Sequence, residues 1–225
     1  MGLKEMKLPQ GISNYKIEVL SAGVKVTGDN VKAPYVQYSG EFNIKDNGRQ
    51  VSIAEKGNSN FMGNSRFFNS GNVGIFGSNL IIVNGQVISG NANVVTNIGG
   101  EPSYAEVIVP KKTKPFINMT GKSSDLTVSN LILEQLHAKT MSGDISLQEL
   151  DMIIGKIKTM SGDIDATILE SILNYQISMK TISGKTRQQS NETTAPKIYP
   201  KKHVLDLETI SGDINLLFKG QERTV

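Results

Sequence analysis

The sequence contains no cysteine, no tryptophan and only two histidines in its 225 residues. The absence of cysteine excludes disulfides and thiolate chemistry. No run of about 18 apolar residues occurs, so the sequence predicts no membrane-spanning helix. The net charge of +3 is slight and argues only weakly for a polyanionic partner, and we expect no binding to nucleic acid.

The first residues, Met1–Lys7, lack the apolar stretch of a secretion signal. As written, the chain is therefore expected in the cytoplasm. If a signal has been removed, it is expected in the cell envelope. The absence of cysteine is compatible with either compartment, so the sequence leaves the localisation open.

A short motif recurs in the second half of the chain. Ser-Gly-Asp-Ile stands at residues 142–145, 161–164 and 211–214, and weaker copies stand at 123–126 and 183–186. The first serines of successive copies are separated by 19, 19, 22 and 28 residues. A period near 20 residues is typical of a stacked repeat architecture.

The residues on either side of each motif alternate between apolar and polar. Leu136, Ala138 and Thr140 share one face before a motif, and Ile145 and Leu147 share one face after it. This period of two predicts a strand, a Ser-Gly-Asp corner, a second strand and a return. We therefore expect an all-β chain that forms a single-stranded β-helix (β-solenoid) with coils of about 19–22 residues.

Threonine precedes each regular corner at an inward position. These threonines are expected to form one column in which stacked hydroxyls bond each other: Thr140, Thr159, Thr181 and Thr209.

The sequence divides into two regions. Residues 1–110 form an N-terminal β region whose antiparallel strands continue the stack, and residues 111–225 form the regular repeats. A segment rich in Gly, Asn and Phe, residues 57–100, interrupts the first region with a loop at 57–77 and then a pair of strands. The apolar residues Leu216–Phe218 close the chain and are expected to cover the open end of the stack.

The corner residues have a structural interpretation. Glycine permits a positive φ, and Ser and Asp side chains bond nearby backbone amides. We assign this role to Ser142, Gly143, Asp144, Ser161, Gly162, Asp163, Ser183, Gly184, Ser211, Gly212 and Asp213.

Stacked aspartates could alternatively attract a cation, since Asp125, Asp144, Asp163 and Asp213 would line one edge. However, the Gly-Gly-x-Gly-x-Asp pattern of calcium-binding repeats is missing, and Lys185 stands within the column. We therefore predict no metal and no cofactor.

Four of the seven phenylalanines lie in the first part of this segment, residues 57–77, and are the candidate interaction residues: Phe61, Phe67, Phe68 and Phe76. Exposed aromatics are unfavourable unless something covers them. Either these side chains pack onto the flank of the solenoid, or they form a surface for a partner, including another copy of the chain.

Other polar residues give weaker signals. Lys139, Lys158 and Lys180 share an outer face that either is solvated or binds anionic glycans or nucleic acid, and the solvated reading is favoured because no aromatic residues interleave with them. His137 and His203 belong to no spaced ligand set. The outward acids show no repeated grouping of the kind that polysaccharide-cleaving β-helices carry: Glu134, Glu149, Asp151, Asp165 and Glu170. We therefore predict no catalytic residues and no enzymatic activity.

The pattern resembles a bacterial "putative adhesin" family of domains of unknown function. The segments that carry the resemblance are Ala105–Pro110, Thr140–Ile145, Thr159–Ile164, Thr181–Gly184 and Thr209–Ile214. It covers residues 12–56 and 101–218. The resemblance implies single-stranded β-helix proteins, many of them in the cell envelope, and it carries over no catalytic or ligand residue.

Together these observations predict a non-catalytic, adhesin-like scaffold or binding module. Its loops, especially 57–77 and 187–203, would contact a protein or glycan surface whose identity the sequence does not give. The alternative is a self-assembling, polymer-forming β-helix protein, including a virion component, and hence a homo-oligomer. A glycan-active enzyme is the third and weakest reading.

Overall fold

The computed structural model describes residues 2–56, 103–191 and 202–220, together with the backbone of three short strands between residues 73 and 89. The chain divides into two compact units. One consists of residues 1–55 and 102–225, and the other consists of residues 56–101. The second unit is thus a continuous insertion into the first.

The insertion contains a small antiparallel sheet made of β7 (Val73–Phe76), β8 (Leu80–Val83) and β9 (Gln86–Ser89). The sequence predicts the pair β8 and β9. β7 lies in the segment predicted as a loop, and that prediction is wrong for these four residues, because they pair with β8 along their whole length. Phe61, Phe67 and Phe68 lie outside the described residues, and Phe76 is described only as the last backbone position of β7.

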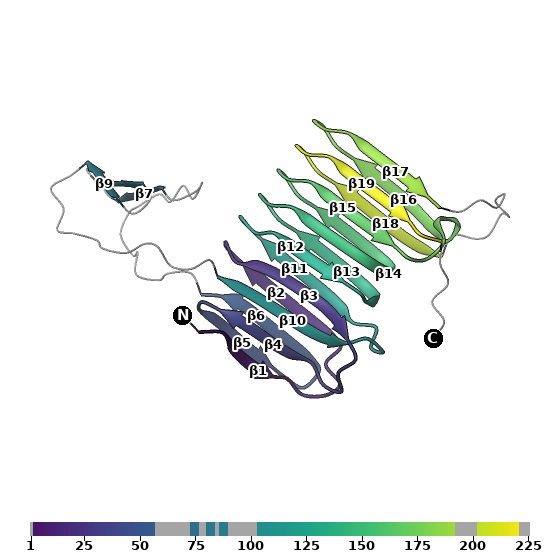
Figure 1. The fold of residues 1–225 in the computed structure, drawn as a ribbon, viewed down its shortest axis with the longest axis horizontal. Coiled ribbons are helices and arrows are strands. Elements are labelled where there is room, and N and C mark those ends of the chain that lie inside the picture. Colours follow the sequence, from purple (N-terminus) through teal and green to yellow (C-terminus); the bar gives the residue numbers. More distant parts are fainter. Residues whose placement is uncertain are drawn as a thin grey trace. The chain divides into compact units, whose positions relative to one another are not determined.

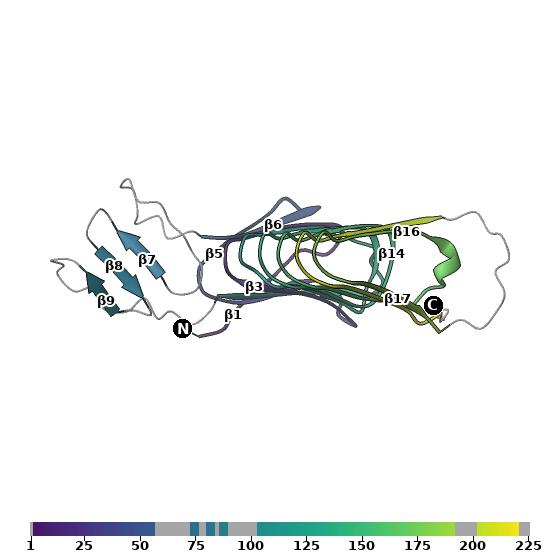
Figure 2. The same cartoon turned by 90° about the horizontal axis from the view of Figure 1, so that it is seen from above.

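Two sheets face each other in the larger unit (Figure 1), and Figure 2 shows them as opposite walls of flattened coils. Sheet A has the order β1 (Lys4–Lys7), β4 (Tyr35–Ser39), β10 (Tyr104–Pro110), β3 (Gly23–Asp29), β12 (Leu126–Ser129), the start of β14 (Ile145–Lys158), β15 (Ile164–Ile168), β19 (Ile214–Phe218) and β17 (Thr186–Ser190). Sheet B has the order β5 (Phe42–Asp46), β6 (Gln50–Glu55), β2 (Asn14–Val19), β11 (Phe116–Gly121), β13 (Ile132–Lys139), the end of β14, β18 (His203–Glu208) and β16 (Tyr175–Lys180).

A coil runs along sheet B, turns through a corner into sheet A and returns to sheet B at the opposite edge. β14 makes that return without a break, because Glu149 turns the strand with a φ of 54°. Asn130, with a φ of 60°, makes the equivalent turn one coil earlier. A short 3₁₀ turn, η1 (Ile172–Asn174), lies in the return before β16. The fold is all-β and solenoid-like.

The core lies between the two sheets and follows the period of two in the sequence. In β19, Ile214, Leu216 and Phe218 are buried while the residues between them are partly exposed. Each buried aliphatic or aromatic side chain of this kind stabilises the fold by about 1.5–3 kcal/mol. Alternation therefore sets which face of each strand points inward.

The N-terminal end of the stack is antiparallel. β1 pairs with β4, β4 pairs with β10 and β5 pairs with β6, all antiparallel. These strands extend both sheets. β2 and β3 differ from the predicted antiparallel arrangement, since they form a parallel coil that pairs with β11 and β12.

The order of coils in space differs from their order in the sequence at both ends. The early coil β2–β3 lies between β6 and β10 on one side and β11 and β12 on the other. The last coil, β18–β19, is inserted between β14 and β15 on one side and β16 and β17 on the other (Figure 1).

The chain therefore does not form an uninterrupted single-stranded β-helix, because its coils do not stack in the order of the sequence. Because β3 lies between β10 and β12, strands from both sides of residue 110 also share one sheet and one compact unit.

The inward residues explain why β18–β19 is not the last coil in space. Gln188 of β17 pairs with Leu216 of β19, and both other inward positions of β17 are also polar, Thr186 and Ser190. All residues of β17 are exposed. A coil with apolar inward residues needs a coil on each side, whereas a polar one can end a stack. The expectation that Leu216–Phe218 cover the open end is thus wrong.

Candidate functional site

The Ser-Gly-Asp corners lie one above another along a single edge of the stack. Their first serines form parallel bridges in the spatial order Ser123, Ser142, Ser161, Ser211 and Ser183. The insertion of the last coil is therefore visible in the corners too, with residue 211 between residues 161 and 183.

The aspartates of the corners form a ladder of hydrogen bonds to the backbone. Oδ1 of Asp125 accepts from the N–H of Asp144 at 2.9 Å, and Oδ1 of Asp144 accepts from the N–H of Asp163 at 2.8 Å. Asp163 accepts from the N–H of Asp213 at 2.8 Å in the same way. Each carboxylate therefore holds the next coil in register.

Lys185 occupies the last rung of this ladder. Its N–H donates to Oδ1 of Asp213 at 2.8 Å, and within the described residues no further coil follows it. Among the described residues, an aspartate at position 185 would find no backbone N–H of a further coil to accept from. The departure from the motif thus follows from the position of this coil at the end of the stack.

The first rung uses a residue that sequence reasoning missed. Oε2 of Glu55, the last residue of β6, accepts from the N–H groups of Leu20, Ser21 and Ala22 at 2.7, 2.9 and 3.0 Å. The insertion of residues 56–101 begins directly after Glu55, where a corner would otherwise stand. No repeat marks this glutamate, so the sequence offers no signal for it.

The threonines form the predicted column, but their hydroxyls bind the backbone. Oγ1 of Thr159 donates to the carbonyl oxygen of Gly143 at 3.2 Å, and Oγ1 of Thr209 donates to that of Gly162 at 3.1 Å. The expectation that the hydroxyls bond each other is wrong. A corner carbonyl lies within reach of each hydroxyl and would otherwise stay unpaired.

The corner glycines allow the coils to approach closely. Gly143 has a φ of 132°, and a Cβ atom there would lie 2.3 Å from the carbonyl oxygen of Ser124. Gly162 has a φ of 143°, with 2.2 Å to the carbonyl oxygen of Gly143. No other residue type fits either constraint.

One residue in each corner points outward, and most of these residues are apolar. Of the six exposed large hydrophobic residues in the described part of the chain, only Leu3 lies elsewhere. We call the other five the apolar ridge; in spatial order they are Leu20, Met141, Met160, Ile210 and Ile182, with exposed fractions of 38, 51, 42, 37 and 82%.

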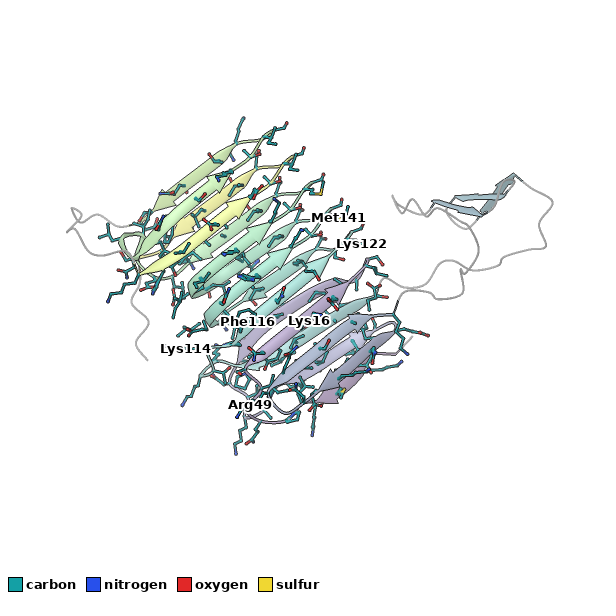
Figure 3. The ribbon with its side chains drawn as sticks, turned by 180° about the vertical axis from the view of Figure 1, so that it is seen from behind. Lys16, Arg49, Lys114, Phe116, Lys122 and Met141 are labelled. Carbon is teal, nitrogen blue, oxygen red and sulfur yellow. The ribbon has the colours of Figure 1, made fainter. Side chains whose placement is uncertain are left out.

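Lys122 occupies the corner between Leu20 and Met141, and Figure 3 shows Lys122 and Met141 at neighbouring corners of one edge, away from Lys114 and Arg49. Sequence reasoning missed the ridge, although its signal is present as the variable position of Thr-x-Ser-Gly-Asp. That position holds Met, Met and Ile in the three full copies.

The ridge has a basic row on the side of sheet B. In spatial order the row contains Lys139, Lys158, Glu208 and Lys180. Lys158 Nζ lies 2.8 Å from Oε1 of Glu208, and this hydrogen bond lowers the pKa of the Glu208 carboxyl. On the side of sheet A the ridge is flanked by the aspartate ladder. Its two flanks therefore carry charges of opposite sign.

An open depression of about 470 Å³ adjoins the N-terminal part of the ridge. Its lining includes Ser21, Ser123, Asp125 and Tyr104. Burial, together with Glu106, which accepts a hydrogen bond from the Tyr104 hydroxyl, raises the pKa of Tyr104 to about 12. The depression thus presents neutral hydroxyls beside one carboxylate.

The two histidines lie in different surroundings, and only His203 forms a pair with one of the outward acids. His137 contacts the ring of Phe116, and its pKa is lowered by burial and by Lys156. His203 Nδ1 lies 2.9 Å from Oε2 of Glu170. Within the described residues, no three His, Asp or Glu side chains are grouped so that they could hold a metal ion.

Comparison with known proteins identifies the family. The sequence model of Toastrack DUF4097 matches residues 12–225. The chain belongs to this family. The resemblance to bacterial "putative adhesin" domains is thereby confirmed. No curated protein matches this chain.

A solved structure has a similar fold. A "putative cell adhesion protein" from Clostridium sporogenes matches with a TM-score of 0.60 and 11% identity over 97% of this chain and 99% of that one. "Putative adhesins" from Bacteroides fragilis and Parabacteroides distasonis match with TM-scores of 0.37 and 0.27, at 8% and 12% identity, over 97% of both chains in each case. In the described part of this Toastrack chain, no helix is long and apolar enough to cross a membrane.

Proposed function

We propose that this Toastrack chain is a non-catalytic, adhesin-like binding module whose binding surface is the apolar ridge. The observation that carries the proposal is the position of Leu20, Met141, Met160, Ile210 and Ile182 in one exposed column. A row of apolar side chains on an otherwise polar surface is typical of an interaction site. The name of the Clostridium sporogenes protein, a "putative cell adhesion protein", supports a role in adhesion.

The ladder makes the ridge suitable for recognition. Each ridge residue is followed within three positions by residues whose backbone or side chain is bonded to the neighbouring coil, as in the pairs Asp144–Asp163 and Asp163–Asp213. A surface that is rigid before binding loses little conformational entropy on binding. The proposed mechanism is therefore surface complementarity on a preorganised edge.

The repeated polar residues support a role without bond chemistry. The ladder aspartates accept backbone N–H groups, and the threonine hydroxyls donate to backbone carbonyls. An activated nucleophile would instead need a base within hydrogen-bond reach. These side chains have structural partners, which supports a binding module over a glycan-active enzyme.

End-to-end polymerisation, the alternative function, is less well supported. β17 is an exposed edge strand, which favours association. Stacking a second molecule on it would, however, bury the polar inward residues Thr186, Gln188 and Ser190. Binding at the apolar ridge would not bury these polar inward residues.

The proposal is tested by adhesion of coated beads. Beads that carry the chain are mixed with bacterial cells, immobilised glycans and immobilised extracellular proteins. We expect adhesion to at least one of these surfaces, a loss of about tenfold or more for the double variant Met141→Lys/Met160→Lys, and no loss for Leu3→Lys. Leu3 is the matched control, since it is an exposed hydrophobic residue outside the ridge. Equal adhesion of the ridge variant, or no adhesion of the wild type, would show that the proposal is wrong.

A further inference from the structure

The two flanks of the ridge carry equal and opposite charges at the four corners of Met141, Met160, Ile210 and Ile182. On the side of sheet B stand three lysines and one glutamate, a net charge of +2: Lys139, Lys158, Glu208 and Lys180. On the side of sheet A stand three aspartates and one lysine, a net charge of −2: Asp144, Asp163, Asp213 and Lys185. A partner that fits both flanks must carry the reverse arrangement.

A second copy of the chain presents the opposite net charge to each flank in one orientation. If the two-fold axis is parallel to the direction in which the coils stack, the basic flank of each ridge faces the acidic flank of the other. If the axis is perpendicular to that direction, basic faces basic and acidic faces acidic. In the first orientation Lys139 and Lys158 face aspartates, whereas Glu208 faces Asp213 and Lys180 faces Lys185. The summed charges of the facing flanks are still +2 and −2, so this orientation is favoured over one in which flanks of like net charge meet.

We propose that a second copy of this chain binds along the apolar ridge, related by a two-fold axis parallel to the stacking direction. This inference rests on the proposed function and names the partner of the same surface. In the dimer each ridge residue lies opposite its own counterpart. Met141 and Met160 then form the centre of the contact, flanked by Lys139 and Lys158 facing Asp144 and Asp163 of the other copy.

A flat anionic membrane fits the ridge less well. Lipid head groups would attract the basic flank but would repel the aspartate ladder on the other flank. Side chains that lie on a solenoid also repeat at about 4.8 Å, so two ridges match each other in spacing. Charge and spacing therefore both favour a second copy.

The size of the contact predicts weak binding. From Leu20 to Ile182 the ridge spans five steps, about 24 Å at the usual strand spacing. Two such narrow edges bury on the order of 700 Å² in total, below the roughly 1,200 Å² of stable complexes. The dissociation constant is therefore expected in the range of about 10 µM to 1 mM. Many such contacts between two coated surfaces would still hold firmly, because they act together.

The first experiment is sedimentation velocity over protein concentrations from about 1 µM to 1 mM. We expect a reversible monomer–dimer equilibrium that weakens about tenfold or more in Met141→Lys/Met160→Lys and remains unchanged in Leu3→Lys. Lys139→Glu is expected to weaken the dimer, whereas Lys4→Glu, a charge reversal on the distant strand β1, is not. Higher salt should weaken the wild-type dimer, since its flanking charges are exposed.

The second experiment measures the orientation with single cysteines, which is simple because the sequence contains none. Leu20→Cys, Met160→Cys and Ile182→Cys are each oxidised at high concentration. In the proposed dimer each variant forms a disulfide with its own copy, since like residues lie opposite each other. In the perpendicular arrangement, Leu20→Cys would instead cross-link to Ile182→Cys in a mixture of the two.

The outcomes separate this inference from the proposed function. A strictly monomeric chain, a dimer that Met141→Lys/Met160→Lys leaves intact, or cross-links only between Leu20→Cys and Ile182→Cys would overturn the inference. If the chain is monomeric but its beads adhere through the ridge to cells or glycans, the proposed function stands and its partner is another molecule. If beads cluster with each other but bind no other surface, the inference stands and the wider adhesive function falls.

Discussion

Oδ1 of Asp163 accepts a hydrogen bond from the backbone N–H of Asp213 at 2.8 Å, although the two residues are 50 positions apart in the sequence. Asp163 belongs to a coil in the middle of the chain, and Asp213 belongs to the last one. The bond therefore joins the inserted C-terminal coil to the regular stack at its exposed edge.

Replacing Asp163 with alanine removes this acceptor. We expect Asp163→Ala to lower the free energy of unfolding by about 1 kcal/mol, since the N–H of Asp213 then has only water as a partner. Asp163→Asn keeps an acceptor oxygen and should cost less. Urea unfolding measures both, with Asp206→Ala on the outer face of β18 as control. A loss in Asp206→Ala as large as in Asp163→Ala would contradict a role of the ladder.

Gly162 is a corner position where a side chain cannot be accommodated. Gly162→Ala places a Cβ atom 2.2 Å from the carbonyl oxygen of Gly143 at a φ of 143°. We expect a loss of about 3 kcal/mol or more in the free energy of unfolding, because the coil must move away from its neighbour. Gly48→Ala is the control, since no atom lies within 4 Å of its added Cβ although its φ of 85° is also positive. Similar losses of stability in both variants would mean that the positive φ causes the loss, and not the contact with the carbonyl oxygen of Gly143.

The polar end of the stack can be tested with one pair of residues. Leu216 and Gln188 are register partners on adjacent strands, but Leu216 is buried and Gln188 is exposed. We expect Leu216→Asp to cost about 3 kcal/mol or more and Gln188→Asp to change stability by less than about 0.5 kcal/mol. Thermal unfolding of the two variants side by side provides the measurement. A large loss in Gln188→Asp would mean that β17 does not end the stack.

Two buried tyrosines should respond differently to removal of their hydroxyl groups. Tyr175 OH donates to the carbonyl oxygen of Met152 and accepts from its N–H, at 3.0 and 3.2 Å, whereas the hydroxyl of Tyr15 has no hydrogen-bond partner in the described part of the chain. We expect Tyr175→Phe to lose about 1–2 kcal/mol and Tyr15→Phe to lose nothing or gain slightly at neutral pH. Calorimetry or urea unfolding distinguishes the two.

The same tyrosines set the response to alkali. Burial raises the pKa of both hydroxyls above the ordinary value. A raised pKa in the folded state contributes stability that is complete below the unfolded pKa of about 10 and is lost as the pH rises above it. The free energy of unfolding should therefore fall above about pH 10, and less steeply in Tyr15→Phe. An unchanged slope in that variant would contradict the assignment.

Much of the repeat could be predicted because local rules determine it. The spacing of the serines, the alternation around Thr140–Ile145 and the turn chemistry of Ser, Gly and Asp all describe interactions within one coil or with an identical neighbour. The position of each aspartate on a neighbouring backbone N–H follows from the same repetition. The strand pair β8 and β9 follows from the turn signal at Asn84-Gly85 in the same way.

The order of the coils could not be read from the motifs, since every corner is compatible with every other. The polar residues Thr186, Gln188 and Ser190 did hold that information, but only when compared with Ile214, Leu216 and Phe218. Glu55 and the ridge depend on tertiary position. Glu55 acts on amides more than thirty residues earlier in the chain. The repeat marks Met141, Met160 and Ile210 of the ridge, but only the tertiary structure places Leu20 in line with them.

The insertion of β18–β19 has a consequence for how the protein is made. During translation the strands β16 and β17 leave the ribosome before β18 and β19, the strands with which they pair. The nascent chain can therefore assemble its central coils early, but the C-terminal half reaches its final arrangement only after synthesis of the last coil. A ribosome that stalls before residue 203 leaves a chain whose terminal coil has no native neighbour.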